Sequence, residues 1–94
     1  MTVALLLIDL HLTPARSLKE KRMVLNRLKK QLRAHHNLAL AEVDHQDLWQ
    51  RSGLALVTVS GTRDLATQCL EAACREIEEQ LPGEVLSSSV EFLV

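Results

Sequence analysis

Residues 2–20 read TVALLLIDLHLTPARSLKE, an apolar run followed by the signature of a helix start. The run up to Thr13 is too short for a buried helix with its caps, and Pro14 ends it, so a strand is predicted over Thr2–Thr13. Alternate side chains of a strand point to opposite faces. One face is uniformly apolar and carries Ala4, Leu6, Ile8, Leu10 and Leu12. The other begins with Val3, Leu5 and Leu7 and ends with Asp9 and His11.

The next segment predicts a helix. Ser17-Leu18-Lys19-Glu20 has the form of a capping box, with Ser17 as the N-cap and Glu20 in the first turn. The helix is expected to run to about His36. Its apolar stripe consists of Leu18, Val24, Leu25, Leu28 and Leu32. Lys21 points near this stripe, and we expect its long side chain to pass the edge of the core and reach solvent.

The remaining chain supplies three strands and a second helix. Alternating apolar residues predict strands over 38–43 and 51–60, joined by a polar hairpin connection or bulge at 44–47. A helix is predicted over 63–81, and a last strand over 86–94. The order βαββαβ predicts a ferredoxin-like α+β sandwich, in which two helices cover one face of a four-stranded antiparallel sheet.

Length and composition set bounds on the class of protein. The chain has 94 residues, of which 47% are hydrophobic and 24% charged, so we expect one globular domain over residues 1–94. No apolar run approaches the roughly 20 residues of a membrane span, and no signal peptide is recognisable. Cys69 and Cys74 fall on divergent sides of the second helix, which does not suit a disulfide. We therefore expect a cytoplasmic protein without membrane association.

Two segments carry a family resemblance. Residues 17–22, SLKEKR, and residues 41–51, AEVDHQDLWQR, resemble the YlxP-like family of small, single-domain bacterial proteins whose function is not established. The likeness covers essentially the whole chain and implies the same ferredoxin-like fold. Genes of this family often lie beside those for translation initiation and ribosome maturation. The resemblance therefore implies a role with RNA or the ribosome.

Positive charge is concentrated on the first helix, although the net charge is only -1. Between Arg16 and Arg33 the chain is rich in cations and contains a single acid, whereas Arg75 is the only base after Asp64. We call one flank of this helix the basic ridge; it consists of Lys19, Arg22, Lys29, Lys30 and Arg33. Such a ridge suits the phosphates of RNA. The alternative is a solvated face, paired with acids of the second helix: Asp64, Glu71, Glu78 and Glu79.

The hairpin connection holds the most chemically suggestive group, Asp44, His45, Asp47, Trp49 and Arg51. Two carboxylates and an imidazole suit a divalent metal or acid–base chemistry, and an arginine suits a phosphate. Alternation sends Asp44 and His45 to opposite faces unless a bulge redirects one of them. The structural interpretation has the carboxylates capping backbone N–H groups, Arg51 pairing with a carboxylate, and Trp49 covering one end of the core. We expect a recognition site near this hairpin.

The sheet face without helices is expected to be apolar. We assign Leu5 and Leu7 of the first strand and Leu54 and Leu56 of the third to this face, with Leu38 and Leu40 beside them. Monomers seldom expose such a patch, so a homodimer through the open sheet face is predicted. Base stacking on this face, as in RNA-recognition motifs, is disfavoured because neither central strand carries an aromatic residue.

These patterns favour a non-enzymatic accessory protein with no cofactor. The chain has no Gly-rich phosphate loop, CxxC motif, HExxH motif or nucleophile elbow. One alternative is a small hydrolase or metal-binding enzyme centred on Asp44, His45 and Asp47. A second is a dimeric ligand-sensing domain, although the glycine-containing ligand turn is missing. An acylphosphatase-like anion site at Arg16 also lacks its glycines.

Overall fold

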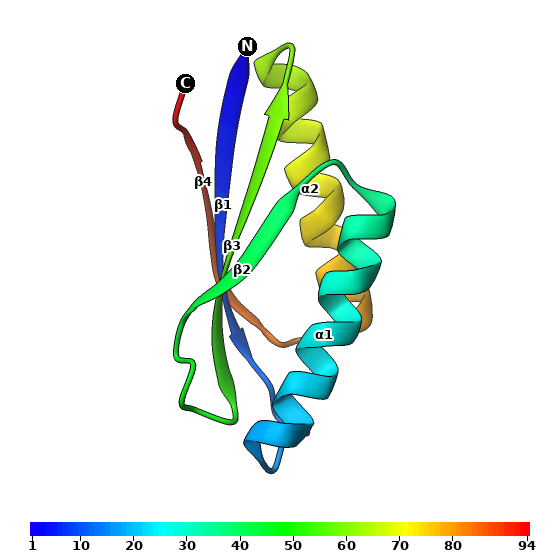
Figure 1. Cartoon of the computed structure of the whole chain (residues 1–94), viewed down its shortest axis with the longest axis vertical. Coiled ribbons are helices and arrows are strands. Elements are labelled where there is room, and N and C mark those ends of the chain that lie inside the picture. The colour runs from blue at the N-terminus through cyan, green and yellow to red at the C-terminus, as the bar shows by residue number, and fades with distance from the viewer.

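Six elements of secondary structure follow one another in the computed structural model, which describes residues 1–94. They are β1 (Thr2–His11), α1 (Leu18–His35), β2 (Ala39–Asp44), β3 (Arg51–Ser60), α2 (Arg63–Gln80) and β4 (Val85–Phe92). The strands form one antiparallel sheet in the order β2-β3-β1-β4. Both helices cover the same face of that sheet (Figure 1). This is the ferredoxin-like α+β fold, so the predicted fold class is confirmed.

Each helix begins at a side chain that caps it. Ser17 Oγ accepts a hydrogen bond from the N–H of Glu20 at 3.1 Å, and Glu20 Oε2 accepts one from the N–H of Arg16 at 2.8 Å. Thr62 Oγ1 accepts from the N–H of Leu65 at 3.2 Å. These caps satisfy amide groups that have no partner inside the helix. No helix of the structure is both long enough and apolar enough to pass through a lipid bilayer.

An aliphatic core lies between the sheet and the helices. It contains the whole predicted apolar face of β1, and Leu10 is completely buried. The helices contribute Leu25, Leu28 and Leu32 from α1 and Ala66, Leu70, Ala73 and Ile77 from α2. The helical spacing of the apolar residues therefore located the inner side of α1 correctly.

The assignment of faces on β3 was wrong. Leu54 and Leu56 are completely buried beneath the helices instead of lying on the open face. The antiparallel register places Leu56 opposite Leu6 and Leu54 opposite Ile8, and residues directly opposite one another share a face. Leu40 lies opposite Leu56 and is likewise buried, and Leu38 packs against the core.

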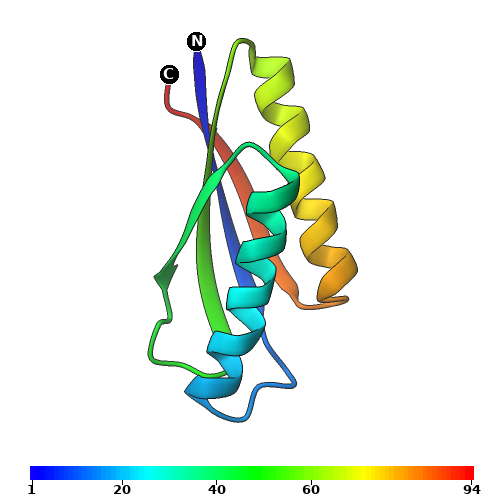
Figure 2. The ribbon, with the colours of Figure 1, turned by 45° about the vertical axis from the view of Figure 1, so that its right-hand side comes forward.

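The open face nevertheless remains apolar, because both alternating sets of β3 residues are apolar. Leu5 and Leu7 of β1 lie on it as predicted, paired with Val57 and Ala55. We call the apolar residues of the two central strands on this side the open-face patch; it consists of Val3, Leu5, Leu7, Ala55, Val57 and Val59. The turned view in Figure 2 shows both helices packed on the opposite side.

Candidate functional site

Lys21 of α1 is a buried charge beneath the β2–β3 hairpin, with only 1% of the residue exposed. Its Nζ donates hydrogen bonds to the backbone carbonyls of His45 at 2.7 Å and Leu48 at 2.6 Å. The same Nζ lies 2.8 Å from Glu42 Oε2. The prediction that Lys21 reaches solvent was therefore wrong. The hairpin loop folds over the end of the side chain and supplies its partners.

Glu42 and Ser52 complete a buried network around this lysine. Glu42 belongs to β2 and points to the helix-covered face, since it lies opposite Leu54. The Ser52 hydroxyl, fully buried on β3, donates to Glu42 Oε2 at 2.7 Å. A buried ion pair is tolerated only when its charges are paired and hydrogen-bonded. We therefore assign Lys21, Glu42 and Ser52 the role of fixing the hairpin against α1.

A second polar group lies at the same end of the sheet but on its open face. Arg51 Nη2 donates to Asp9 Oδ2 at 2.6 Å. His45 Nε2 lies 3.8 Å from Asp9 Oδ1 and 3.7 Å from Asp44 Oδ2. We call Asp9, Asp44, His45 and Arg51 the open-face cluster. It joins β1 to the hairpin, and its ion pair confirms that Arg51 is held by a carboxylate.

A β-bulge brings Asp44 and His45 together. The pairing of β2 with β3 shifts between Glu42 and Asp44, so Val43 is the extra residue. His45 then adopts a left-handed backbone conformation with φ of 57°. Its backbone N–H donates to Asp44 Oδ1 at 2.9 Å, as the structural interpretation expected of this carboxylate. The bulge removes the conflict that strict alternation predicted.

Gly53 provides the space for this arrangement. A Cβ atom at position 53 would lie 2.7 Å from the Cβ of Asp44. Beside it is a hollow of about 420 Å³, lined by residues that include Leu7, Asp9, Asp44 and Ser87. Asp9 Oδ1 and Arg51 Nε are buried and have no hydrogen-bond partner. The carboxylates of Asp9 and Asp44 and two serine hydroxyls give this hollow polar groups that could bind a small polar molecule, whereas His45 and Arg51 do not line it.

Asp47 and Trp49 do not join the open-face cluster. They line a separate hollow of about 370 Å³ at the tip of the hairpin, together with Leu48. Trp49 is 53% exposed, so the interpretation that it covers the core is wrong. Asp44, His45 and Asp47 do not converge as three metal ligands. The one trio of residues whose ligand atoms all lie within 4.8 Å of each other is His35, His36 and Glu76.

The basic ridge lies on the flank of α1 that faces away from α2. The other flank carries Val24 and Gln31, which share a hollow with Gln80 and Leu81 at the end of α2. No ion pair joins a ridge cation to an acidic side chain. Arg33 instead donates to the backbone carbonyl of Leu40 in β2 at 3.3 Å. The acids of α2 therefore do not neutralise the ridge through direct pairing.

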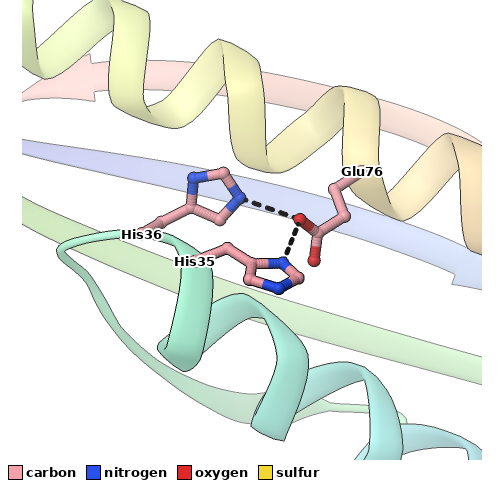
Figure 3. Close-up of side chains that lie close together, drawn as sticks. All are labelled: His35, His36 and Glu76. Atoms are coloured by element: carbon pink, nitrogen blue, oxygen red, sulfur yellow. Dashed lines mark hydrogen bonds and ion pairs between the residues drawn. The ribbon is translucent and has the colours of Figure 1, made fainter.

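The end of α1 is linked to α2 by two adjacent histidines (Figure 3). His35 Nδ1 lies 2.8 Å, and His36 Nε2 3.2 Å, from Glu76 Oε1. Burial raises the pKa of the Glu76 carboxyl, but hydrogen bonds from the two histidines outweigh burial, so that this pKa lies below its ordinary value. Histidines at the end of a helix can also complement the negative end of its dipole.

Sequence reasoning missed the partners that the fold brings together from distant segments. Lys21, Glu42 and Ser52 were not recognised as a unit, and Asp9 was not identified as the partner of Arg51. One signal was available: Lys21 occupies a position on the apolar stripe of α1, where a charge requires buried partners. The polar hairpin was the segment able to supply them.

The chain is thus a ferredoxin-like α+β protein with two polar clusters at the hairpin end, a basic ridge along α1 and a histidine pair at the end of that helix. The chain belongs to the family described as "Protein of unknown function (DUF503)", whose model matches residues 3–90. It is similar to "Uncharacterized protein YlxP" of Bacillus subtilis (strain 168), with 41% identity over 49 residues. The matched segment spans 52% of this chain and 53% of that protein, about half of each. The resemblance to the YlxP-like family is thereby confirmed.

Proposed function

We propose that this protein is a non-enzymatic, cytoplasmic accessory factor that binds ribosomal RNA through the basic ridge and the tip of the hairpin. The observation that carries the proposal is that no acid of the protein pairs with the ridge. All the ridge residues except Lys29 are exposed, and Lys29 is half-buried. Phosphates that meet such cations release condensed counterions, which makes the binding favourable and dependent on salt.

The hairpin tip supports the same proposal because it lies beside the start of the ridge. Lys21 holds the carbonyl of Leu48, and the Gln50 side chain donates to the carbonyls of Thr13 and Ala15 at 3.3 Å each. Trp49 lies between these two anchored residues and is largely exposed. An exposed indole next to a positive surface suits an unpaired base, because stacking accepts any base.

Charge reversal on the ridge tests this proposal. The Lys29→Glu/Arg33→Glu variant is expected to bind small ribosomal subunits and labelled ribosomal RNA fragments about tenfold or more weakly, with the salt slope reduced by about 2. Co-sedimentation and fluorescence titration measure both effects. Trp49 is the only tryptophan, so its emission should change when RNA binds to the unmodified protein.

The matched control is Arg27→Glu/Arg75→Glu, which changes the net charge equally but leaves the ridge intact. This control is expected to retain the affinity and salt slope of the unmodified protein. Equal losses of RNA affinity in both double variants would show that binding depends on net charge and not on the ridge. Unchanged binding by the ridge variant, or no response of Trp49 to RNA, would contradict the proposal.

We also propose that a second copy of the chain covers the open-face patch. Leu7 is 42% exposed and Val59 52% exposed, and Glu91 of β4, opposite Leu5, lies at the border of the apolar patch. Leu7→Lys is expected to convert a dimer into a monomer, because dimerisation would bury the added charge. Light scattering over a range of concentrations measures this change. The control is Met23→Lys, which adds the same charge at an exposed residue of α1 and should leave the dimer intact. An unmodified protein that stays monomeric at high concentration would contradict this proposal.

A further inference from the structure

We propose that His35, His36 and Glu76 form a binding site for a divalent transition metal of the zinc class, which would fasten the end of α1 to α2. The proposal is independent of RNA binding and of the open-face cluster. It rests on the convergence of three side chains able to ligate a metal, two from the end of α1 and one from α2, as Figure 3 shows. Their ligand atoms all lie within 4.8 Å of one another.

The distances suit a single metal ion. Ligands at the usual zinc distances of about 2.0–2.1 Å in a tetrahedron lie about 3.3 Å from each other. Glu76 Oε1 is 2.8 Å from His35 Nδ1 and 3.2 Å from His36 Nε2. Small rotations of these side chains would therefore admit a metal between them, with neutral imidazoles as ligands in place of hydrogen-bond donors.

The end of α1 explains how two adjacent histidines can reach the same carboxylate. Successive residues in a helix point about 100° apart. His35 is the last helical residue, whereas His36 is the C-cap and has an extended backbone with φ of −136° and ψ of 150°. The change in backbone direction lets the two rings approach Glu76 nearly at right angles to one another, with an interplanar angle of 82°.

The surroundings also suit a metal site that keeps one position open. The side chains of His36 and Glu76 are only 14% and 16% exposed, whereas that of His35 is 59% exposed. The Gln80 side-chain amide donates to Glu76 Oε2 at 3.4 Å, and this outer contact orients the carboxylate with Oε1 toward the histidines. Two imidazoles and one carboxylate with an open position form a ligand set that zinc accepts.

Titration of the metal-free full-length protein with zinc chloride tests the proposal. Calorimetry is expected to show one strong site per chain. At about a hundred times the dissociation constant, zinc should raise the Tm by about 5 °C or more. His36→Ala and Glu76→Gln are each expected to weaken zinc binding by at least about tenfold. Even the loss of a residue that only hydrogen-bonds to a metal ligand lowers metal affinity by about 10–100-fold.

Two controls separate this site from other zinc ligands in the chain. The first control, His45→Ala, alters the open-face cluster. The second, Cys69→Ser/Cys74→Ser, removes both thiols. Both variants are expected to bind zinc with the affinity of the unmodified protein. Loss of binding in either control, or unchanged binding in His36→Ala and Glu76→Gln, would overturn the proposal. If a ligand variant fails to fold, imidazole NMR signals of the unmodified protein provide the test. Zinc should shift those of His35 and His36 and not those of His11 and His45, and the reverse pattern would refute the site.

Discussion

Replacing Lys21 by methionine is expected to lower the free energy of unfolding by about 3–5 kcal/mol, the usual cost of removing one partner of a buried ion pair. Methionine retains much of the apolar stem. It leaves the Glu42 carboxylate without its cation, however, and the carbonyls of His45 and Leu48 without their donor. Urea denaturation followed by circular dichroism measures the change.

Lys19→Met is the matched control, because Lys19 lies on the same helix but is exposed. This control should alter the free energy of unfolding by about 0.5 kcal/mol or less. Adding Glu42→Met to Lys21→Met should recover part of the lost stability, since the double variant no longer buries an unpaired carboxylate. Equal stability of the Lys21→Met and Lys19→Met variants would mean that the buried network does not hold the hairpin.

The buried network also links the fold to the proposed RNA surface. Lys21 lies between Lys19 and Arg22 in sequence, yet its side chain points inward while theirs are exposed. One turn of α1 therefore anchors the hairpin on its inner side and presents cations on its outer side. Loosening the hairpin should consequently alter the placement of Trp49 relative to the ridge without removing any ridge charge.

The element order could be predicted from the sequence because the signals for each helix were local. Ser17 and Glu20 mark the start of α1 within four residues, and the apolar stripe needs only the spacing along one helix. The buried side of β1 could be identified from the contrast between its two faces. One face is apolar throughout, and the other ends in Asp9 and His11. None of these inferences required knowledge of distant segments.

The misassigned and missed features depend on contacts between distant segments. Both alternating sets of β3 are apolar, so only the register against β1 decides that Leu56 is inside and Val57 outside. The partners of Lys21 and of Glu76 lie 21 or more residues away and become neighbours only in the folded chain. The bulge at Val43 also reflects space beside Gly53, which strict alternation does not reveal.

Adjacent residues of β3 offer a direct test of this register. Leu56→Ala is expected to lower the free energy of unfolding by about 2–5 kcal/mol, because it opens a cavity in the aliphatic core. Val57→Ala changes the open face and should cost about 1 kcal/mol or less in the monomer. Thermal and urea denaturation at low protein concentration measure both effects.

Protein concentration separates the core from the proposed dimer in the same pair of variants. A partner that covers the open-face patch makes stability depend on concentration. The cost of Val57→Ala should then grow as the protein is concentrated, whereas that of Leu56→Ala should be large even in dilute solution. If Val57→Ala were the costlier change in dilute solution, the pairing of Leu56 with Leu6 would be wrong. The buried side of β3 would then have to be reassigned.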